Sequence, residues 1–252
     1  MSWNPDQYER FKAERKQPFT DLLALVERRP NMRVLDLGCG TGELTCEMHE
    51  TLGARETIGV DNSETMLAKA RTGGLKPAST LEFRLGDIES FVPDLPFDLI
   101  FSNAALQWVR NHHALLTRLA GFLAPNGQIA IQMPANDDHP SHATAAEVAR
   151  SFGVEPRHDP LLPIDEYARL LDSLGFRRQN VRMQVYGHEL ESAESVIEWV
   201  KGTLLTDYEK RLGTRYPQFL AEYSKTLLPR LGSSRPFFYT YKRVLILGKD
   251  RV

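Results

Sequence analysis

The sequence predicts an α/β fold: a mostly parallel seven-stranded sheet with helices on both faces and a helical cap. Between residues 33 and 133, short apolar runs alternate with segments of helical spacing, which is typical of parallel strands joined by helices. Two further strand-like runs follow, and a largely helical segment over residues 192–231 separates them. We expect that segment to cover the sheet edge where ligands bind in open α/β sheets.

Turn and capping residues set the expected elements. A helix over residues 5–29 should break or kink at Pro18, which lacks the amide hydrogen of a helix interior. Ser63 is the expected N-cap of one helix, and Gly53 should end another. The expected strands cover residues 33–38, 56–61, 81–87, 97–106, 128–134, 176–190 and 243–248. The other expected helices cover residues 41–53, 63–74, 112–127, 136–153 and 163–176, and His112 and His113 should be exposed helix caps.

The length fits one domain over residues 1–252. Its core should comprise residues 30–135, 175–190 and 236–252. The helical cap should comprise residues 1–29, 136–174 and 191–235.

Composition excludes several classes of partner. The net charge is −2, and lysines and arginines are scattered, which argues against nucleic acid or an anionic membrane as a partner. The two cysteines, Cys39 and Cys46, have a spacing unlike a zinc pair, and we expect neither a disulfide nor a metal site. The N-terminus is polar and no apolar stretch is long enough to span a bilayer, so we expect a cytoplasmic protein.

A glycine-rich loop, VLDLGCGTG, follows the first expected strand over residues 34–42. Glycines here allow close backbone approach, and the next helix offers free N–H groups to a ligand such as NAD, FAD or S-adenosylmethionine. Dinucleotide sites usually have G-x-G-x-x-G, whereas Gly38, Gly40 and Gly42 form G-x-G-x-G. Asp36, at the loop entrance, suits the ammonium of S-adenosylmethionine better than a pyrophosphate.

The ends of the next two strands supply further cofactor contacts. Asp61 ends the second strand, where a carboxylate can accept hydrogen bonds from both ribose hydroxyls. Asp87 ends the third strand and can accept from the adenine amino group, while Ile88 can cover the ring.

These motifs carry a family resemblance. VLDLGCGTG, GVD and GDI, in this order, resemble the class I S-adenosylmethionine-dependent methyltransferases over residues 33–133, which implies a Rossmann-like fold. SWNPDQYERFKAER, SNAALQWV, IQMP and FFYTYKRVLIL further resemble the trans-aconitate 2-methyltransferases across the chain, most clearly up to Pro134. That resemblance implies methyl esterification of a small polycarboxylate, most notably trans-aconitate.

The candidate site residues follow from the motifs and the resemblance. On one face of the N-terminal helix, Tyr8 and Arg15 can hold the cofactor carboxylate; the alternative is a solvated amphipathic helix. Trp108 either walls the substrate pocket or packs in the core. The full cofactor set is Tyr8, Arg15, Asp36, Gly38, Cys39, Gly40, Asp61, Asn62, Met66, Asp87, Ile88, Asn103 and Leu106. The substrate set is Trp3, Gln107, Trp108, Tyr186, Arg235 and Tyr239, with Arg157, His158 and Tyr241 as further candidates.

The expected chemistry needs no catalytic acid or base. A carboxylate nucleophile is already ionised at neutral pH, so alignment and exclusion of water remain for the protein to supply. We therefore expect no general base and no metal. Two alternatives remain open: methylation of another small acid or a malonyl thioester, and a non-catalytic S-adenosylmethionine-binding protein. The sequence leaves the oligomeric state open.

Overall fold

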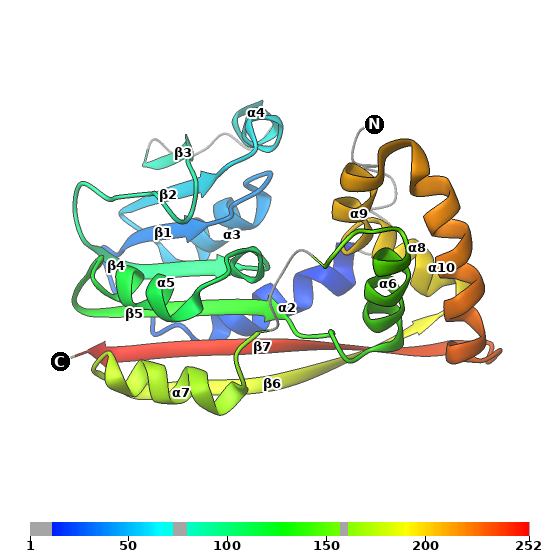
Figure 1. Ribbon diagram of the computed structural model, residues 1–252. Helices are drawn as coiled ribbons and strands as arrows, with labels where there is room; N and C mark the ends of the chain where they lie inside the picture. Colours follow the sequence, from blue (N-terminus) through cyan, green and yellow to red (C-terminus); the bar gives the residue numbers. More distant parts are fainter. Residues whose placement is uncertain (1–11, 73–79, 157–160, 252) are drawn as a thin grey trace. The chain divides into compact units, whose positions relative to one another are not determined.

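The computed structural model describes residues 12–72, 80–156 and 161–251, with side chains from residue 16 onward. Within these residues one sheet has seven strands, in the order β3-β2-β1-β4-β5-β7-β6 (Figure 1). The strands are β1 (Arg33–Leu37), β2 (Glu56–Asp61), β3 (Leu81–Leu85), β4 (Phe97–Asn103), β5 (Leu123–Pro134), β6 (Phe176–Leu190) and β7 (Phe237–Arg251). The helices are α2 (Lys12–Leu25), α3 (Glu43–Leu52), α4 (Glu64–Thr72), η1 (Leu106–Trp108), α5 (His112–Ala120), α6 (Pro140–Ser151), α7 (Ile164–Ser173), α8 (Glu194–Lys201), α9 (Leu205–Leu212), η2 (Gly213–Arg215) and α10 (Tyr216–Leu231).

The strand pairing confirms the predicted fold class. β1 pairs in parallel with β2 and β4, β2 with β3, and β4 with β5, whereas β7 pairs antiparallel with β5. The strand order reverses at β1, because β2 lies on one side of it and β4 on the other. In open α/β sheets, ligands bind at this switch point, beyond the carboxyl ends of the strands.

The chain divides into two compact units. The first, called the sheet unit here, comprises Gln17–Pro134, Leu161–Gln184 and Arg243–Val252. The second, called the helical unit here, comprises Met1–Lys16, Ala135–Pro160 and Val185–Lys242. In the described residues, no helix is both long and apolar enough to cross a bilayer.

One face of the sheet unit is covered by α2 and α3. Phe19 and Leu22 of α2 are 1% and 0% exposed, and the ring of Phe19 packs edge-on against Phe101 of β4 at 5.6 Å. Pro18 does not divide the helix into two segments as expected, because α2 runs without interruption through that residue. A proline inside a helix costs about 3 kcal/mol, and burying two large apolar side chains directly after it offsets that cost.

The helical unit has its own aromatic core. The helical nature of residues 192–231 is confirmed by α8, α9 and α10. Trp199 of α8, Phe219 of α10 and Tyr239 of β7 are all nearly inaccessible within one cluster. β7 begins at Phe237, earlier than the expected start at residue 243, because Tyr239 and Tyr241 alternate inward at the two-residue spacing of a strand.

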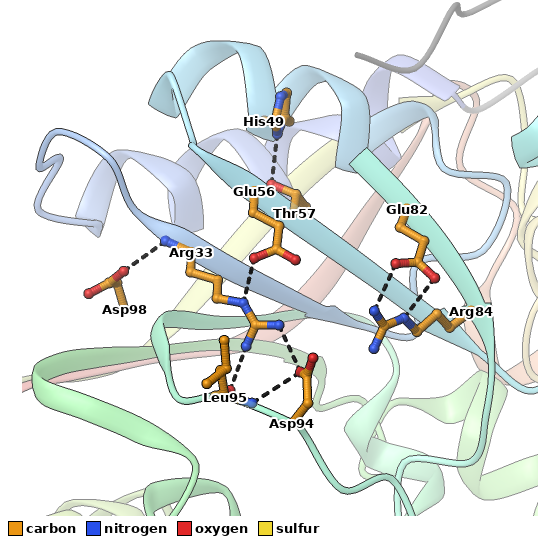
Figure 2. A network of polar contacts seen from close by, with 9 residues as sticks. All are labelled: Arg33, His49, Glu56, Thr57, Glu82, Arg84, Asp94, Leu95 and Asp98. Carbon is orange, nitrogen blue, oxygen red and sulfur yellow. Dashed lines mark hydrogen bonds and ion pairs between the residues drawn. The ribbon is translucent and has the colours of Figure 1, made fainter. Parts of the chain in front are cut away.

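A buried arginine ties the amino end of β1 to its neighbours, as Figure 2 shows. Arg33 is 2% exposed, and its guanidinium contacts Glu56 at 2.5 Å, Asp94 at 2.8 Å and the carbonyl of Leu95 at 2.5 Å. Its backbone N–H also donates to the carboxylate of Asp98 at 2.7 Å. This network anchors the chain between β3 and β4 at the end of β1 that lies away from the glycine loop.

Candidate cofactor and substrate site

The glycine loop after β1 is packed at its ends and open in its middle. Gly38, Gly40 and Gly42 have φ of 79°, 56° and 73°. A Cβ on Gly38 would lie 2.1 Å from the Cβ of Ala105, and one on Gly42 would lie 2.5 Å from the ring of Phe83. A Cβ on Gly40 would meet nothing within 4 Å. The loop therefore presents bare backbone to open space at Gly40, as close approach of a ligand requires.

The end of β2 fastens this loop. The carbonyl of Val60 accepts the N–H groups of Gly38 and Cys39 at 2.8 and 3.1 Å. The carboxylate of Asp61 accepts the N–H of Gly40 and that of Ser63, both at 2.9 Å. Each carboxylate oxygen has a second lone pair, so Asp61 retains capacity for a ribose.

Three further cofactor candidates lie in the glycine loop and just after β2, and they differ in exposure. Cys39 is buried, and burial raises the pKa of its thiol. Asn62 is exposed and Met66 is half-buried at the start of α4. Ser63 caps that helix as predicted, because its hydroxyl accepts the N–H of Met66 at 3.4 Å.

Asp36 is a buried carboxylate at the carboxyl end of β1. It is 6% exposed, and the hydroxyl of Thr45 donates to it at 2.6 Å. Burial raises the pKa of Asp36 to about 7; the nearby charge of Asp61 adds to the rise and the bond from Thr45 opposes it. A carboxylate with a raised pKa gains from a cationic partner, because the opposite charge stabilises its ionised form.

Two further acceptors lie at the end of β4 and in the turn η1 that follows it. Asn103 Oδ1 and Gln107 Oε1 are buried and have no hydrogen-bond partner in the described part of the chain. The other atom of the Gln107 amide, Nε2, donates to the carbonyl of Ala104 at 2.8 Å. An ammonium group carries three donors and no acceptor. The carboxylate of Asp36 and these two unpaired oxygens are acceptors, which is the kind of group that an ammonium requires.

The chain after β3 holds the residues expected at the adenine. Asp87 is exposed and accepts the N–H of Glu89 at 2.7 Å. Arg118 of α5 donates to the carbonyl of Ile88 and to that of Phe91. The sequence did not point to Arg118, because nothing in the α5 sequence distinguishes it. Its two partners lie 27 and 30 residues away along the chain.

A buried histidine, His112, contacts the backbone of the turn η1, which carries Gln107. Leu106 is 1% exposed, whereas Trp108 is 40% exposed and so is not a core residue. His112 Nε2 lies 3.0 Å from the carbonyl of Leu106, and its Nδ1 lies 2.5 Å from the hydroxyl of Tyr167. The nitrogen facing the carbonyl carries the proton, so Nδ1 accepts from the hydroxyl.

The expectation that His112 is an exposed cap is wrong. Asn111 caps α5 instead, because its side-chain oxygen accepts the N–H of Ala114 at 3.0 Å. His112 is 6% exposed, and burial lowers its pKa. His113 is exposed as expected and contacts Glu166, but it lies within the first turn of α5 and does not cap the helix either.

Several substrate candidates lie in the helical unit. Tyr239 is fully buried, with its ring edge-on to Trp199 at 5.5 Å. Tyr186 is 8% exposed, and Tyr241 is 4% exposed in the same cluster as Tyr239. Arg235 is exposed and lies 3.7 Å from Glu194. Trp3, Tyr8, Arg157 and His158 lie outside the described residues, as does the side chain of Arg15.

Known proteins resemble this chain in sequence and in fold. The family described as "Methyltransferase domain" matches residues 28–161. Trans-aconitate 2-methyltransferase of Deinococcus radiodurans is 42% identical over 259 residues, covering 98% of each chain. The enzyme of the same name from Escherichia coli is 36% identical over 229 residues, covering 87% of this chain and 89% of its own.

Solved structures support the fold alone, because their identities are low. The YcgJ protein of Bacillus subtilis aligns with a TM-score of 0.64 at 20% identity, over 93% of this chain and 98% of its own. An S-adenosylmethionine-dependent methyltransferase from Geobacter sulfurreducens, solved with S-adenosyl-L-homocysteine, aligns with a TM-score of 0.58 at 20% identity, over 92% and 91% of the two chains. Together with the full-length sequence matches, these findings show that the chain is an S-adenosylmethionine-dependent methyltransferase and belongs to the trans-aconitate 2-methyltransferase family.

Proposed function

We propose that this enzyme methylates a carboxylate of trans-aconitate, producing a methyl ester. The observation that carries the proposal is the near full-length identity to enzymes named for that acid, 42% over 98% of the chain in one case. The acceptors near the carboxyl ends of β1 and β4 support S-adenosylmethionine as the cofactor. Asp36, Asn103 and Gln107 can accept hydrogen bonds from its ammonium.

We assign the cofactor residues by their place at this edge. Asp36, Asn103 and Gln107 would hold the ammonium, and the bare backbone at Gly40 would pass beneath the cofactor. Asp61 would accept from the ribose. Asp87 and Ile88 would bind the adenine, with their loop held by Arg118.

The proposed reaction does not require the protein to transfer a proton. S-adenosylmethionine, when bound, supplies an electrophilic methyl group. The acid oxygen is ionised at neutral pH, so no side chain has to remove a proton from it. The protein must orient the acid, exclude water and neutralise the carboxylates that do not react.

The helical unit and the cellular setting form part of the same proposal. We assign the helical unit, with Tyr186, Arg235 and Tyr239, to substrate recognition within a single methyltransferase domain. We further place the enzyme in the cytoplasm, acting on a small free acid rather than on nucleic acid.

The test is a methyl-transfer assay with labelled S-adenosylmethionine. The purified protein is incubated with trans-aconitate, and the product is analysed for a methyl ester that mild alkali hydrolyses. Aconitate isomers, citrate, dicarboxylates and a malonyl thioester serve as competing acids. Preferred turnover of trans-aconitate supports the proposal.

Two other outcomes would replace it. Preferred turnover of the malonyl thioester or of another acid would reassign the substrate. Tight binding of S-adenosylhomocysteine in calorimetry, with no turnover of any acid, would contradict the enzymatic role.

A further inference from the structure

A row of polar side chains crosses the sheet unit at the carboxyl ends of its parallel strands. The register places Asp36 beside Phe101 and Asn103 beside Gln132. Because Phe101 and Asn103 are two residues apart on β4, all four side chains lie on one face of the sheet. β7 continues the row, since Gln132 lies opposite Leu245 and Pro134 lies opposite Arg243. Asp36, Asn103, Gln132 and Arg243 thus share one face, on four adjacent strands.

Two glutamines on β5 differ in how their amides are satisfied. Gln128 is 1% exposed, its Oε1 accepts the N–H of Glu27 at 2.9 Å and its Nε2 donates to the Glu27 carbonyl at 2.8 Å. Gln132, four residues on and on the same face, is 0% exposed, and its Nε2 has no hydrogen-bond partner among the described residues. Gln128 is therefore a structural residue, whereas Gln132 has a buried donor that the described residues do not satisfy.

Arg243 sets the direction in which that donor points. Its Nη1 donates to Gln132 Oε1 at 3.4 Å. In this contact the amide oxygen faces the guanidinium, which leaves Nε2 as the unpaired atom. Arg243 is 8% exposed, so its positive charge lies in a largely dehydrated place.

We propose that Gln132 and Arg243 form a carboxylate subsite, which binds a carboxylate of the acid substrate that does not react. This inference rests on the proposed function. An amide donor beside a guanidinium matches an oxygen pair, and hydrogen bonds between ionised partners are the stronger kind.

The order of groups along the row assigns this subsite to the acid. The acceptors, Asp36 and the Asn103 oxygen, lie on β1 and β4, and the donors, Gln132 and Arg243, lie on β5 and β7. Asp36 on β1 and Arg243 on β7 are three strand spacings apart, roughly 14 Å, so the two charged ends of the row are separate. The row thus offers its negative end to a cation and its positive end to an anion, as methyl transfer from a sulfonium to a carboxylate requires.

The test compares Arg243→Gln, Gln132→Met and the matched control Gln128→Met. For Arg243→Gln we expect KM for the acid to rise about 10- to 100-fold, the usual range for loss of one charged hydrogen bond. For Gln132→Met we expect a rise of about 5- to 20-fold. Gln128→Met should lower the melting temperature and leave KM unchanged. Arg243→Lys should recover part of the loss, because it keeps the charge without the fork.

A second measurement removes a purely structural explanation. The wild type should prefer trans-aconitate to a monoester of the same acid in which a carboxylate that does not react is esterified, because this monoester has one carboxylate fewer. Arg243→Gln should narrow that preference, since the group that senses the extra carboxylate is gone. An unchanged KM and an unchanged preference in Arg243→Gln would overturn the subsite.

The cofactor carries a carboxylate too, and a third measurement separates the two sources. Calorimetry compares S-adenosylhomocysteine with methylthioadenosine, which lacks the amino-acid end. We expect Arg243→Gln to bind both as the wild type does, which also shows that it is folded. A selective loss of S-adenosylhomocysteine affinity, with KM for the acid unchanged, would assign the subsite to the cofactor and overturn the proposal. If the wild type methylates no acid at all, the proposed function fails instead.

Discussion

The hydroxyl of Thr45 donates to the carboxylate of Asp36 at 2.6 Å, and it does so in a place where Asp36 is 6% exposed. This bond favours the ionised carboxylate, but burial disfavours it more, so the pKa of Asp36 rises to about 7. The enzyme therefore has a carboxylate at the proposed cofactor site whose charge changes near neutral pH.

Cofactor binding should depend on the charge of Asp36. We expect the Kd of S-adenosylhomocysteine in the wild type to rise by up to about tenfold per pH unit below pH 7, because protonation removes the partner of the ammonium. Asp36→Asn should bind about 10-fold or more weakly at pH 8 and should show a flat profile. Calorimetry between pH 5.5 and 8 checks this. The same pH slope in Asp36→Asn would show that another group controls binding.

The stability of the enzyme without cofactor should respond in the opposite direction. A carboxyl group with a raised folded-state pKa binds more protons folded than unfolded between about pH 4 and pH 7. Raising the pH through this window therefore lowers the free energy of unfolding, by at most about 4 kcal/mol for this group. Urea unfolding at several pH values should show the decline in the wild type relative to Asp36→Asn. A difference between the two proteins that stays constant from pH 4 to 7 would contradict the assignment.

Gly40 can be tested against a glycine of the same conformation. Gly40 and Gly53 have φ of 56° and 57°, and a Cβ on either meets nothing within 4 Å. Each alanine variant should lose about 1 kcal/mol of stability, the cost of a left-handed residue. Only Gly40→Ala should also lower the affinity for S-adenosylhomocysteine, by about tenfold or more, because its methyl group fills space meant for a ligand. Equal affinities in calorimetry would place the cofactor elsewhere.

Short-range patterns predicted the part of the site that neighbouring residues build. The glycine loop, Asp36 and Asp61 lie on two strand ends, and their residue types, their spacing and the family resemblance together indicated which cofactor they suit. Gln132 and Arg243 did not emerge, because they are 111 residues apart and only the antiparallel pairing of β7 brings them together. Likewise the partner of His112 comes from α7, 55 residues away, and the local helix pattern contains no trace of it.

The network around Arg33 should matter for stability and not for the reaction. Arg33→Met removes a buried guanidinium whose three partners, Glu56, Asp94 and the carbonyl of Leu95, can be hydrated, so the change should cost about 1–2 kcal/mol. Asp94 is 62% exposed, so Asp94→Asn should cost less than about 1 kcal/mol. Both variants should keep the wild-type KM, since the network lies at the amino end of β1. Urea unfolding with kinetics checks this, and a change in KM for either variant would contradict it.

His112 and His113 form a matched pair for testing the turn that carries Gln107. His112 Nε2 holds the carbonyl of Leu106, while His113 is exposed on the same helix. His112→Asn should lower stability by about 2 kcal/mol, since the hydroxyl of Tyr167 loses its buried acceptor. It should also lower kcat by about tenfold, as a misplaced turn does. His113→Asn should change stability by under about 0.5 kcal/mol and leave kcat unchanged.

The pH dependence of the same pair completes the argument. Burial lowers the pKa of His112. The unfolded chain therefore binds more protons below about pH 6.5, and the stability that neutral His112 contributes is lost as the pH falls through that value toward the lower folded-state pKa. His112→Asn should remove this loss, whereas His113→Asn should keep it. If His112→Asn loses stability but keeps the kcat of the wild type, then His112 supports the core and does not position the turn.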